Sequence, residues 1–168
     1  DTARLFLLFV AGPDKDIEWS DKGVEGSYRF INKLYRLVKE KKLTKTEDKN
    51  LTSKKNKLIK EVTQDFDEFK FNLAIIKLME FSSYLYKRDQ VSRDSLETLI
   101  KLLAPFIPHT CEELWHNLGN KNFISLEKWP TYEEKKIDKK TDASDEFLSL
   151  VRSDINSILN LVKIKPKL

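Results

Sequence analysis

Glycine, proline and cysteine are scarce in this chain of 168 residues. Four glycines and five prolines are too few for the many tight turns of an all-β protein. The single cysteine, Cys111, excludes an internal disulfide and favours a reducing compartment. No stretch approaches the roughly 18 consecutive apolar residues of a membrane-spanning helix. We therefore expect a cytoplasmic protein that makes no contact with a membrane.

Motifs that carry catalytic chemistry are also absent from the sequence. It contains no glycine-rich phosphate loop, no evident nucleophile–base pair and no catalytic pair of carboxylates. One group of potential metal ligands lacks the sharper cysteine or histidine spacing of zinc sites. Its members are His109, Cys111, Glu112, Glu113 and His116. We expect the two glutamates to compensate a helix N-terminus and His109 and Cys111 to pack or cap, with no catalytic or metal site.

Charged residues, in contrast, make up 35% of the chain and are mixed in sign. The net charge of +4 and the pI of about 9.0 fit a nucleic-acid partner, but also many proteins that bind none. Lysines crowd residues 39–57, where we expect a solvated loop near 43–52. The length suits one domain with its own core, with or without an appendage.

Apolar residues recur at helical spacing through most of the chain. The expected helices cover about 1–11, 21–41, 58–69, 72–86, 96–103, 108–119 and 147–162. Between them we expect a break near 68–71, an extended segment over 122–130 and a charged linker over 131–142. This pattern predicts an all-α fold, an antiparallel helical bundle.

Local signals mark where several of these helices begin and end. Gly12-Pro13 should stop the first helix. Ser20 or Asp21 can cap the second, and Ser92 the one that contains Leu96. Pro108 stands where a first helical turn tolerates proline.

The helix expected over 21–41 carries a surface suited to a polyanion. Its apolar stripe consists of Val24, Tyr28, Ile31, Tyr35 and Val38. One residue further round, Arg29, Asn32, Arg36 and Lys39 form a second stripe that should line the edge of the buried face. Arginine can bridge phosphate oxygens, and asparagine can bond a base or ribose edge. Taken alone, the sequence favours a plainer interpretation, in which these side chains are solvated or pair with nearby glutamates.

Two separated runs resemble a known enzyme family. Residues 1–38 begin Asp-Thr-Ala-Arg-Leu-Phe-Leu-Leu-Phe and continue through Asp-Ile-Glu-Trp-Ser-Asp-Lys-Gly-Val-Glu-Gly. Residues 102–115 include Pro-Phe-Ile-Pro-His-Thr-Cys-Glu-Glu-Leu-Trp, and Trp129-Pro130 follows. These runs are similar, in the same order, to the segment after the catalytic domain of leucyl-tRNA synthetases. The resemblance covers about residues 1–130.

The resemblance implies a domain organisation. Residues 1–20 would end a connector from the catalytic domain, and 21–130 would form a helical domain of the class I anticodon-binding type. Residues 131–168 would add a linker and an extra C-terminal helix. This tail lacks the strands and Val-Asn-Gly-Lys run usual in bacterial leucyl enzymes and looks closer to archaeal-type synthetases.

The resemblance also implies an activity for a larger parent protein. That enzyme would use ATP and Mg to attach leucine to tRNA(Leu), acting as a monomer. The His-x-Gly-His and Lys-Met-Ser-Lys-Ser motifs of this chemistry do not occur here. We therefore expect an excised, catalytically inactive piece with no cofactor of its own, whose partners are tRNA(Leu) and the absent catalytic domain.

The same resemblance directs one helix at tRNA, because Asn32-x-x-x-Arg36 is similar to residues that related synthetases place against it. The implied tRNA-binding residues are Arg29, Asn32, Lys33, Arg36 and Lys39. They would hold the tRNA body by its shape and phosphates rather than read the anticodon. Two alternatives remain open. One is the equivalent domain of a valyl-, isoleucyl- or methionyl-tRNA synthetase, and the other is a helical protein-interaction module that binds no RNA.

Overall fold

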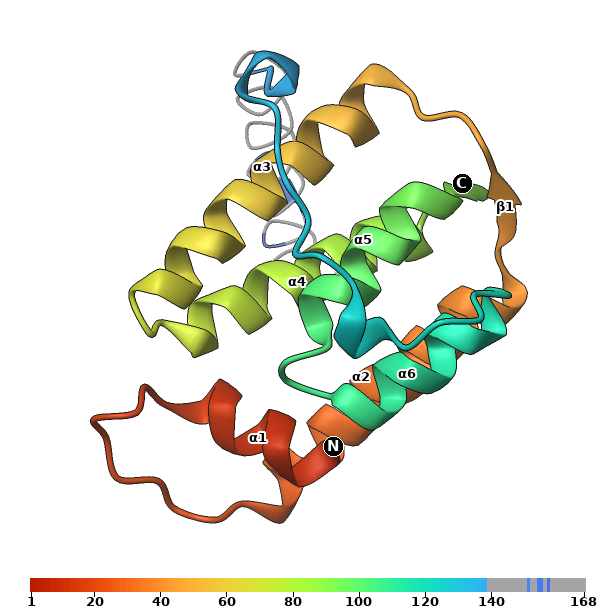
Figure 1. Ribbon diagram of the computed structural model, residues 1–168. Coiled ribbons are helices and arrows are strands. Elements are labelled where there is room, and N and C mark those ends of the chain that lie inside the picture. The colour runs from red at the N-terminus through yellow and green to blue at the C-terminus, as the bar shows by residue number, and fades with distance from the viewer. Residues whose placement is uncertain (139–150, 152–153, 156, 158–168) are drawn as a thin grey trace.

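The structure, a computed structural model, describes residues 1–138, 151, 154–155 and 157. Figure 1 shows a bundle of helices with a very small sheet at its edge. In chain order the described elements are α1 Thr2–Val10, α2 Asp21–Glu40, β1 Lys42–Thr44, α3 Lys49–Asp67, α4 Phe71–Tyr86, β2 Gln90–Ser92, α5 Arg93–Leu103, α6 Pro108–Asn117, and two short 3-10 turns, η1 Ile124–Leu126 and η2 Glu134–Lys136. The predicted helical-bundle class is confirmed. The helix expected over 147–162 lies outside the described residues, apart from four helical positions within it.

The helices pack around one apolar core. The α3–α4 hairpin packs against α5, and α6 contacts both α5 and α2 (Figure 1). The α2 helix also contacts α4, while α1 covers one end by packing on α2 and α4. Fully buried side chains come from five of these helices: Phe6, Leu34, Leu51, Ile75 and Leu99. Burying each such side chain stabilises the fold by roughly 1.5–3 kcal/mol, so the core fixes how α2 is rotated about its axis.

The predicted start and stop signals act as expected. Ser20 Oγ accepts a hydrogen bond from the Gly23 amide at the start of α2, and Ser92 Oγ accepts one from Ser95 at the start of α5. Each bond satisfies one of the amides that a helix N-terminus leaves unpaired. Pro108 opens α6. Gly119 follows α6 at φ +88°, a left-handed conformation that glycine adopts without steric cost.

The small sheet was not predicted. β1 and β2 pair in parallel, with Leu43 opposite Val91, although the sequence suggested a loop near 43–52. The segment expected to be extended over 122–130 instead contains the turn η1, Ile124–Leu126. Strands of three residues are too short to show an alternating pattern. Their pairing depends on the helices bringing two distant connections together.

The lysine-rich stretch is less solvated than predicted. Its second half forms the start of α3, where Asp48 accepts a hydrogen bond from the Leu51 amide at 2.7 Å. Leu51 and Leu58 are buried in the core, and Lys55, between them in the sequence, is also buried. This stretch is more buried than predicted because the core-facing leucines set the rotation of the helix and turn one lysine inward with them.

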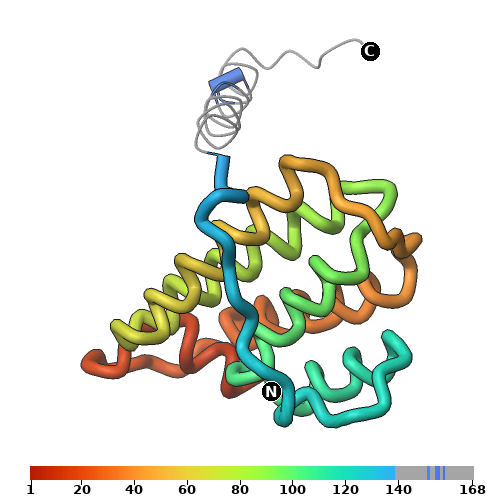
Figure 2. The backbone as a smooth tube through the Cα atoms, turned by 45° about the horizontal axis from the view of Figure 1, so that its top comes forward, coloured from red at the N-terminus to blue at the C-terminus, as the bar shows by residue number. Residues whose placement is uncertain are grey.

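The segment after α6 returns across α3, as Figure 2 shows for the cyan and blue part of the tube. Trp129 Nε1 donates a hydrogen bond to Thr63 Oγ1 at 2.9 Å. Further on, the Glu133 amide donates to Asn56 Oδ1 at 2.7 Å, and the Asp138 amide donates to Ser53 Oγ at 2.7 Å. Buried polar side chains of α3 thus hold the first part of the predicted linker. No helix in the described part of the chain is long and apolar enough to cross a membrane.

Candidate nucleic-acid interface

The buried face of α2 differs from the predicted stripe. Its buried residues are Ser27, Phe30, Ile31, Leu34 and Leu37. Tyr28, which the sequence placed on the apolar face, is 57% exposed. The neighbours of α2 explain the shift, because packing against α1, α4 and α6 at once favours the face that carries Phe30 and the leucines.

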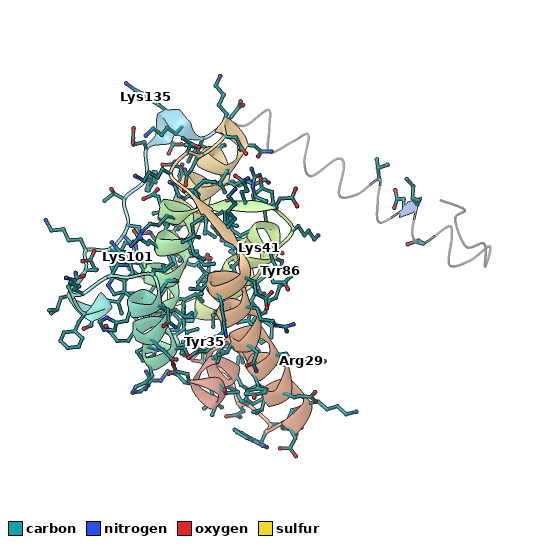
Figure 3. The ribbon with its side chains drawn as sticks, turned by 90° about the vertical axis from the view of Figure 1, so that its right-hand side faces the viewer. Arg29, Tyr35, Lys41, Tyr86, Lys101 and Lys135 are labelled. Atoms are coloured by element: carbon teal, nitrogen blue, oxygen red, sulfur yellow. The ribbon has the colours of Figure 1, made fainter. Side chains whose placement is uncertain are left out.

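With this rotation, the predicted basic stripe becomes an outward ridge rather than the edge of the buried face. Arg29, Arg36 and Lys39 are all exposed. Because each residue turns a helix by about 100°, they lie roughly opposite Leu34 and Leu37. The ridge therefore points into solvent along the second half of α2, and Figure 3 shows Arg29 at the outer edge of the molecule.

The ridge residues differ in how far their charge is neutralised. Arg29 Nε lies 3.9 Å from Glu25 Oε1, with both side chains largely exposed, so this pair contributes little. Within residues 1–138, Arg36 and Lys39 make no hydrogen bond or ion pair from their side chains. Their two positive charges remain available to an anion.

Two of the predicted residues are engaged within the protein. Asn32 Nδ2 donates to the Tyr28 carbonyl at 3.0 Å, which ties one of its two N–H groups to the preceding turn of the same helix. Lys33 Nζ donates to Ser83 Oγ of α4 at 3.0 Å and lies 5.3 Å from the centroid of the Tyr86 ring. Lys33 therefore belongs to the seam between α2 and α4 and not to the ridge.

Lys41 and Tyr86 also belong to this surface, although no pattern in the sequence indicates it. Lys41 follows the last turn of α2, and its Nζ lies 4.9 Å from the Tyr86 ring centroid. The same Nζ donates to the Arg88 carbonyl at 2.8 Å. Figure 3 shows Lys41 and Tyr86 together on the face that carries α2. Helical spacing could not reveal the pair, because the two residues come from helices that meet only in the folded bundle.

The opposite flank of α2 is fastened to α6. Tyr35 Oη donates a hydrogen bond to Glu113 Oε2 at 2.5 Å. Burial, followed by this bond to a carboxylate, raises the pKa of Tyr35 to about 12. A neutral tyrosine therefore links the two helices across the physiological range and holds the ridge in place.

The residues considered for metal binding have other partners. Asp1, not Glu112 or Glu113, supports the start of α6, because its carboxylate accepts from the Thr110 amide at 2.6 Å. Glu112 instead accepts from the Ile124 amide at 3.2 Å. The prediction for the two glutamates was thus wrong, since both lie beyond the first turn of α6. Among the described residues, no group of three or more His, Cys, Asp or Glu could hold a metal ion.

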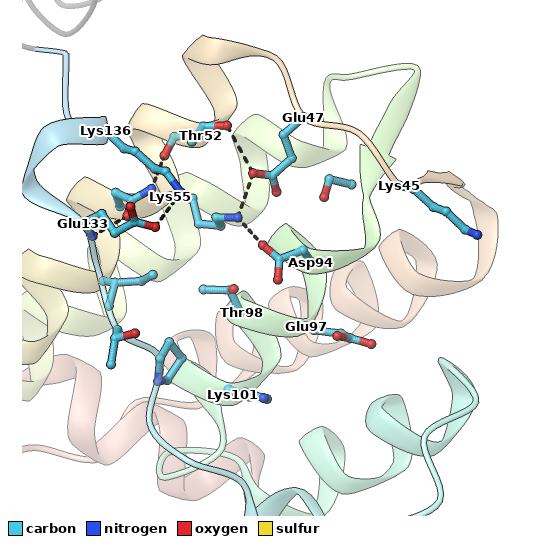
Figure 4. Close-up of a pocket in the computed structure, with 15 residues that line it drawn as sticks. Lys45, Glu47, Thr52, Lys55, Asp94, Glu97, Thr98, Lys101, Glu133 and Lys136 are labelled. Carbon is cyan, nitrogen blue, oxygen red and sulfur yellow. Dashed lines mark hydrogen bonds and ion pairs between the residues drawn. The ribbon is translucent and has the colours of Figure 1, made fainter.

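A polar cavity of about 600 Å³ opens between α3, α5 and residues 130–136 (Figure 4). At its wall Lys55 Nζ bonds Glu47 Oε2 at 2.7 Å and also the carboxylate of Asp94. Burial raises the pKa of Glu47, but hydrogen bonds from Lys55 and Ser95 outweigh it and hold that pKa below its usual range. The single cation lies between two carboxylates, so the cluster has an excess of negative charge; it is suited to stabilising the fold and not to binding an anion.

Comparison with known proteins places this bundle in a family. Residues 48–168 match the family model described as the anticodon-binding domain of tRNA ligase. The leucine–tRNA ligase of Rippkaea orientalis is 45% identical over 148 residues, covering 78% of this chain and 17% of that protein. The leucine–tRNA ligase of Crocosphaera subtropica is 44% identical over 146 residues, covering 77% of this chain and again 17% of its own length.

A solved structure shares the fold as well. It is the agnB2 LeuRS of Agrobacterium radiobacter K84 in a ternary complex with tRNA and LeuAMS. It superposes with a TM-score of 0.71 at 28% identity, covering 82% of this chain and 20% of that one. The chain thus spans about a fifth or less of the relatives it matches. On the family match and these likenesses, the chain belongs to the anticodon-binding domains of tRNA ligases.

Proposed function

We propose that this chain is the tRNA-binding helical domain of a leucine–tRNA ligase and that the ridge of α2 contacts the tRNA backbone. The observation that carries the proposal is the exposed positive charge of Arg36 and Lys39, which no described side chain neutralises. An arginine in this state can form two charge-assisted hydrogen bonds to one phosphate. The similar LeuRS, solved together with tRNA, supports the choice of partner.

We further infer the role of the parent enzyme from its curated relatives, which are leucine–tRNA ligases. It would attach leucine to tRNA(Leu) with ATP and Mg, as a cytoplasmic monomer. This domain would contribute binding and orientation of the tRNA, and the remaining part of the enzyme would contribute the chemistry. The uncompensated cations of α2 favour an RNA partner over a protein-interaction module, because they supply the phosphate contacts that dominate nucleic-acid affinity.

The test replaces Arg36 with alanine in the full-length enzyme. We expect tRNA binding to weaken by about 1–3 kcal/mol, the scale of a lost charge-assisted hydrogen bond. The matched control is Arg93→Ala on α5, because Arg93 is also exposed but already pairs with Glu97 at 2.8 Å. The control should bind tRNA as the wild type does.

Binding isotherms at several salt concentrations and a thermal melt of each variant give the outcome. Exposed substitutions away from buried partners change stability by under about 0.5 kcal/mol, so the melts should coincide. Unchanged tRNA binding by Arg36→Ala, with an unchanged melt, would contradict the proposal. Arg29→Ala, tested alongside, should reduce the slope of log K against log salt by about 0.7–0.9 if Arg29 contacts one phosphate.

A further inference from the structure

The seam between α2 and α4 gathers two ammonium groups around one aromatic ring. Lys33 Nζ lies 5.3 Å and Lys41 Nζ 4.9 Å from the centroid of Tyr86. The ring belongs to the last residue of α4, so three separate places in the chain converge here. Both lysines are anchored, Lys33 by Ser83 Oγ and Lys41 by the Arg88 carbonyl.

Lys33 and Lys41 have different hydrogen-bond partners from two other lysines that lie over aromatic rings. Lys60 lies 5.9 Å from the Tyr132 ring and Lys101 lies 5.0 Å from the Trp115 ring. Each of those two is also paired with a carboxylate, Lys60 with Glu134 at 2.7 Å and Lys101 with Glu127 at 2.6 Å. Lys33 and Lys41 bond only neutral oxygens, and within residues 1–138 no carboxylate lies within 4.0 Å of either. Their charges are oriented without being neutralised.

The electrostatic consequence is a local excess of positive charge. Attraction to the face of a ring stabilises an ammonium modestly, but it does not cancel its net charge. Two like charges held at one ring repel each other, and an anion bound nearby would offset that repulsion. The Tyr86 hydroxyl donates to no residue in the described part of the chain, so it can add a third hydrogen bond to the same anion.

The seam is continuous with the ridge. Lys33 lies four residues after Arg29 and three before Arg36, the spacing at which side chains are neighbours on a helix. A phosphate chain that runs along the ridge therefore reaches the seam without leaving the protein surface. Glu40, the acidic residue nearest to Lys41 in the sequence, forms no ion pair with either lysine.

We propose that Lys33, Lys41 and Tyr86 form a phosphate-binding site that extends the tRNA-binding face from the α2 ridge into the α2–α4 seam. The proposal rests on the proposed function and adds a second group of contacts to it. Lys33 and Lys41 bind the phosphate oxygens as positive charges, and the Tyr86 ring keeps the two ammonium groups at the surface. The ligand is a backbone phosphate of RNA.

The experiment uses the full-length enzyme with Lys33→Gln and Lys41→Gln, singly and together, and measures tRNA binding at several salt concentrations. Glutamine removes the charge but retains an amide that can donate to the original anchor. We expect each single variant to weaken binding roughly tenfold. The slope of log K against log salt should fall by about 0.7–0.9 for each lysine. Tyr86→Phe should weaken binding less, because the ring remains.

Lys60→Gln is the matched control, since it removes a lysine that also lies over a tyrosine but is already neutralised. It should leave both affinity and slope unchanged. Lys41→Arg should retain binding, because it restores the charge. If it binds as weakly as Lys41→Gln, the lysine is structural and the proposal is overturned.

The remaining outcomes separate this proposal from the proposed function. If Arg36→Ala weakens tRNA binding while both glutamine variants retain wild-type affinity and slope, the seam is not a phosphate site, although the ridge still is. If none of these variants affects binding, the proposed function fails as well. Inorganic phosphate at matched ionic strength should compete only weakly, because it offers one anion instead of a chain. If the two lysines govern binding of polyglutamate but not of tRNA, the seam is a protein contact and the proposal is also overturned.

Discussion

Replacing Lys55 with alanine tests whether the ion cluster beside the polar cavity stabilises the fold. The ammonium of Lys55 bonds the carboxylates of Glu47 and Asp94, and only 11% of its side chain is exposed. Glu47, on the connection between β1 and α3, has a side chain that is only 12% exposed. The substitution would leave this carboxylate without its cation.

The stability lost in Lys55→Ala depends on the groups that still surround Glu47. Removing one partner of a buried ion pair costs roughly 3–5 kcal/mol. Two features reduce that cost here. The side chain of Asp94 is 70% exposed, so its carboxylate can be solvated once the lysine is gone. Glu47 retains its hydrogen bond from Ser95 at 2.5 Å and lies beside a cavity of about 600 Å³. We therefore expect a loss of about 2–3 kcal/mol in the free energy of unfolding. For a chain of this size the melting temperature should fall by about 4–12 °C.

Urea unfolding followed by circular dichroism measures this difference at pH 7, and Lys45→Ala provides the control. Lys45 lines the same cavity but is exposed, so its replacement should cost under about 0.5 kcal/mol. The folded-state pKa of Glu47 is lowered, so its contribution is present at neutral pH. It should be lost as the pH falls through that value, and the two proteins should then converge. A loss no greater than that of Lys45→Ala would refute the reasoning.

Two further predictions concern the α2–α6 contact and the chemistry of the chain. The pKa of Tyr35 is raised to about 12 in the folded state from about 10 when unfolded, so the stability that Tyr35 contributes is intact below pH 10 and should decline as the pH rises towards 12. Between pH 9 and pH 11, urea unfolding should show a smaller loss in the free energy of unfolding for Tyr35→Phe than for the wild type. Equal losses would contradict this. The purified chain should catalyse no leucine-dependent pyrophosphate exchange, because it lacks the catalytic motifs, and exchange above a buffer control would show that the assignment of chemistry to the rest of the enzyme is wrong.

The sequence predicted those parts of the fold that depend on local signals. Ser20, Ser92 and Pro108 each act over one helical turn, so the starts of α2, α5 and α6 could be found without knowing the tertiary structure. The break near 68–71 was found for the same reason. The β1–β2 pair was missed, because Leu43 and Val91 are brought together only when the helices between them have packed.

In the candidate site, too, local features could be predicted from the sequence and tertiary contacts could not. Helical spacing correctly grouped Arg29, Arg36 and Lys39 on one stripe, because their separation depends only on the helix itself. The spacing could not fix where that stripe points, since Val24 and Tyr28 offered an apolar face that competes with Phe30 and Leu34. It also could not show that Lys33 turns to Ser83, or that Lys41 meets Tyr86.

The core and the charged surface of α2 are set by one quantity, the rotation of the helix about its axis. Burial of Phe30, Leu34 and Leu37 fixes that rotation on one side. Tyr35 bonded to α6 and Lys33 bonded to α4 fix it on the two flanks. A shift of one residue would turn the helix by about 100°, carry Arg36 to a flank and expose apolar surface. The apolar packing thus determines which cations face a polyanion, although none of the buried side chains could touch one.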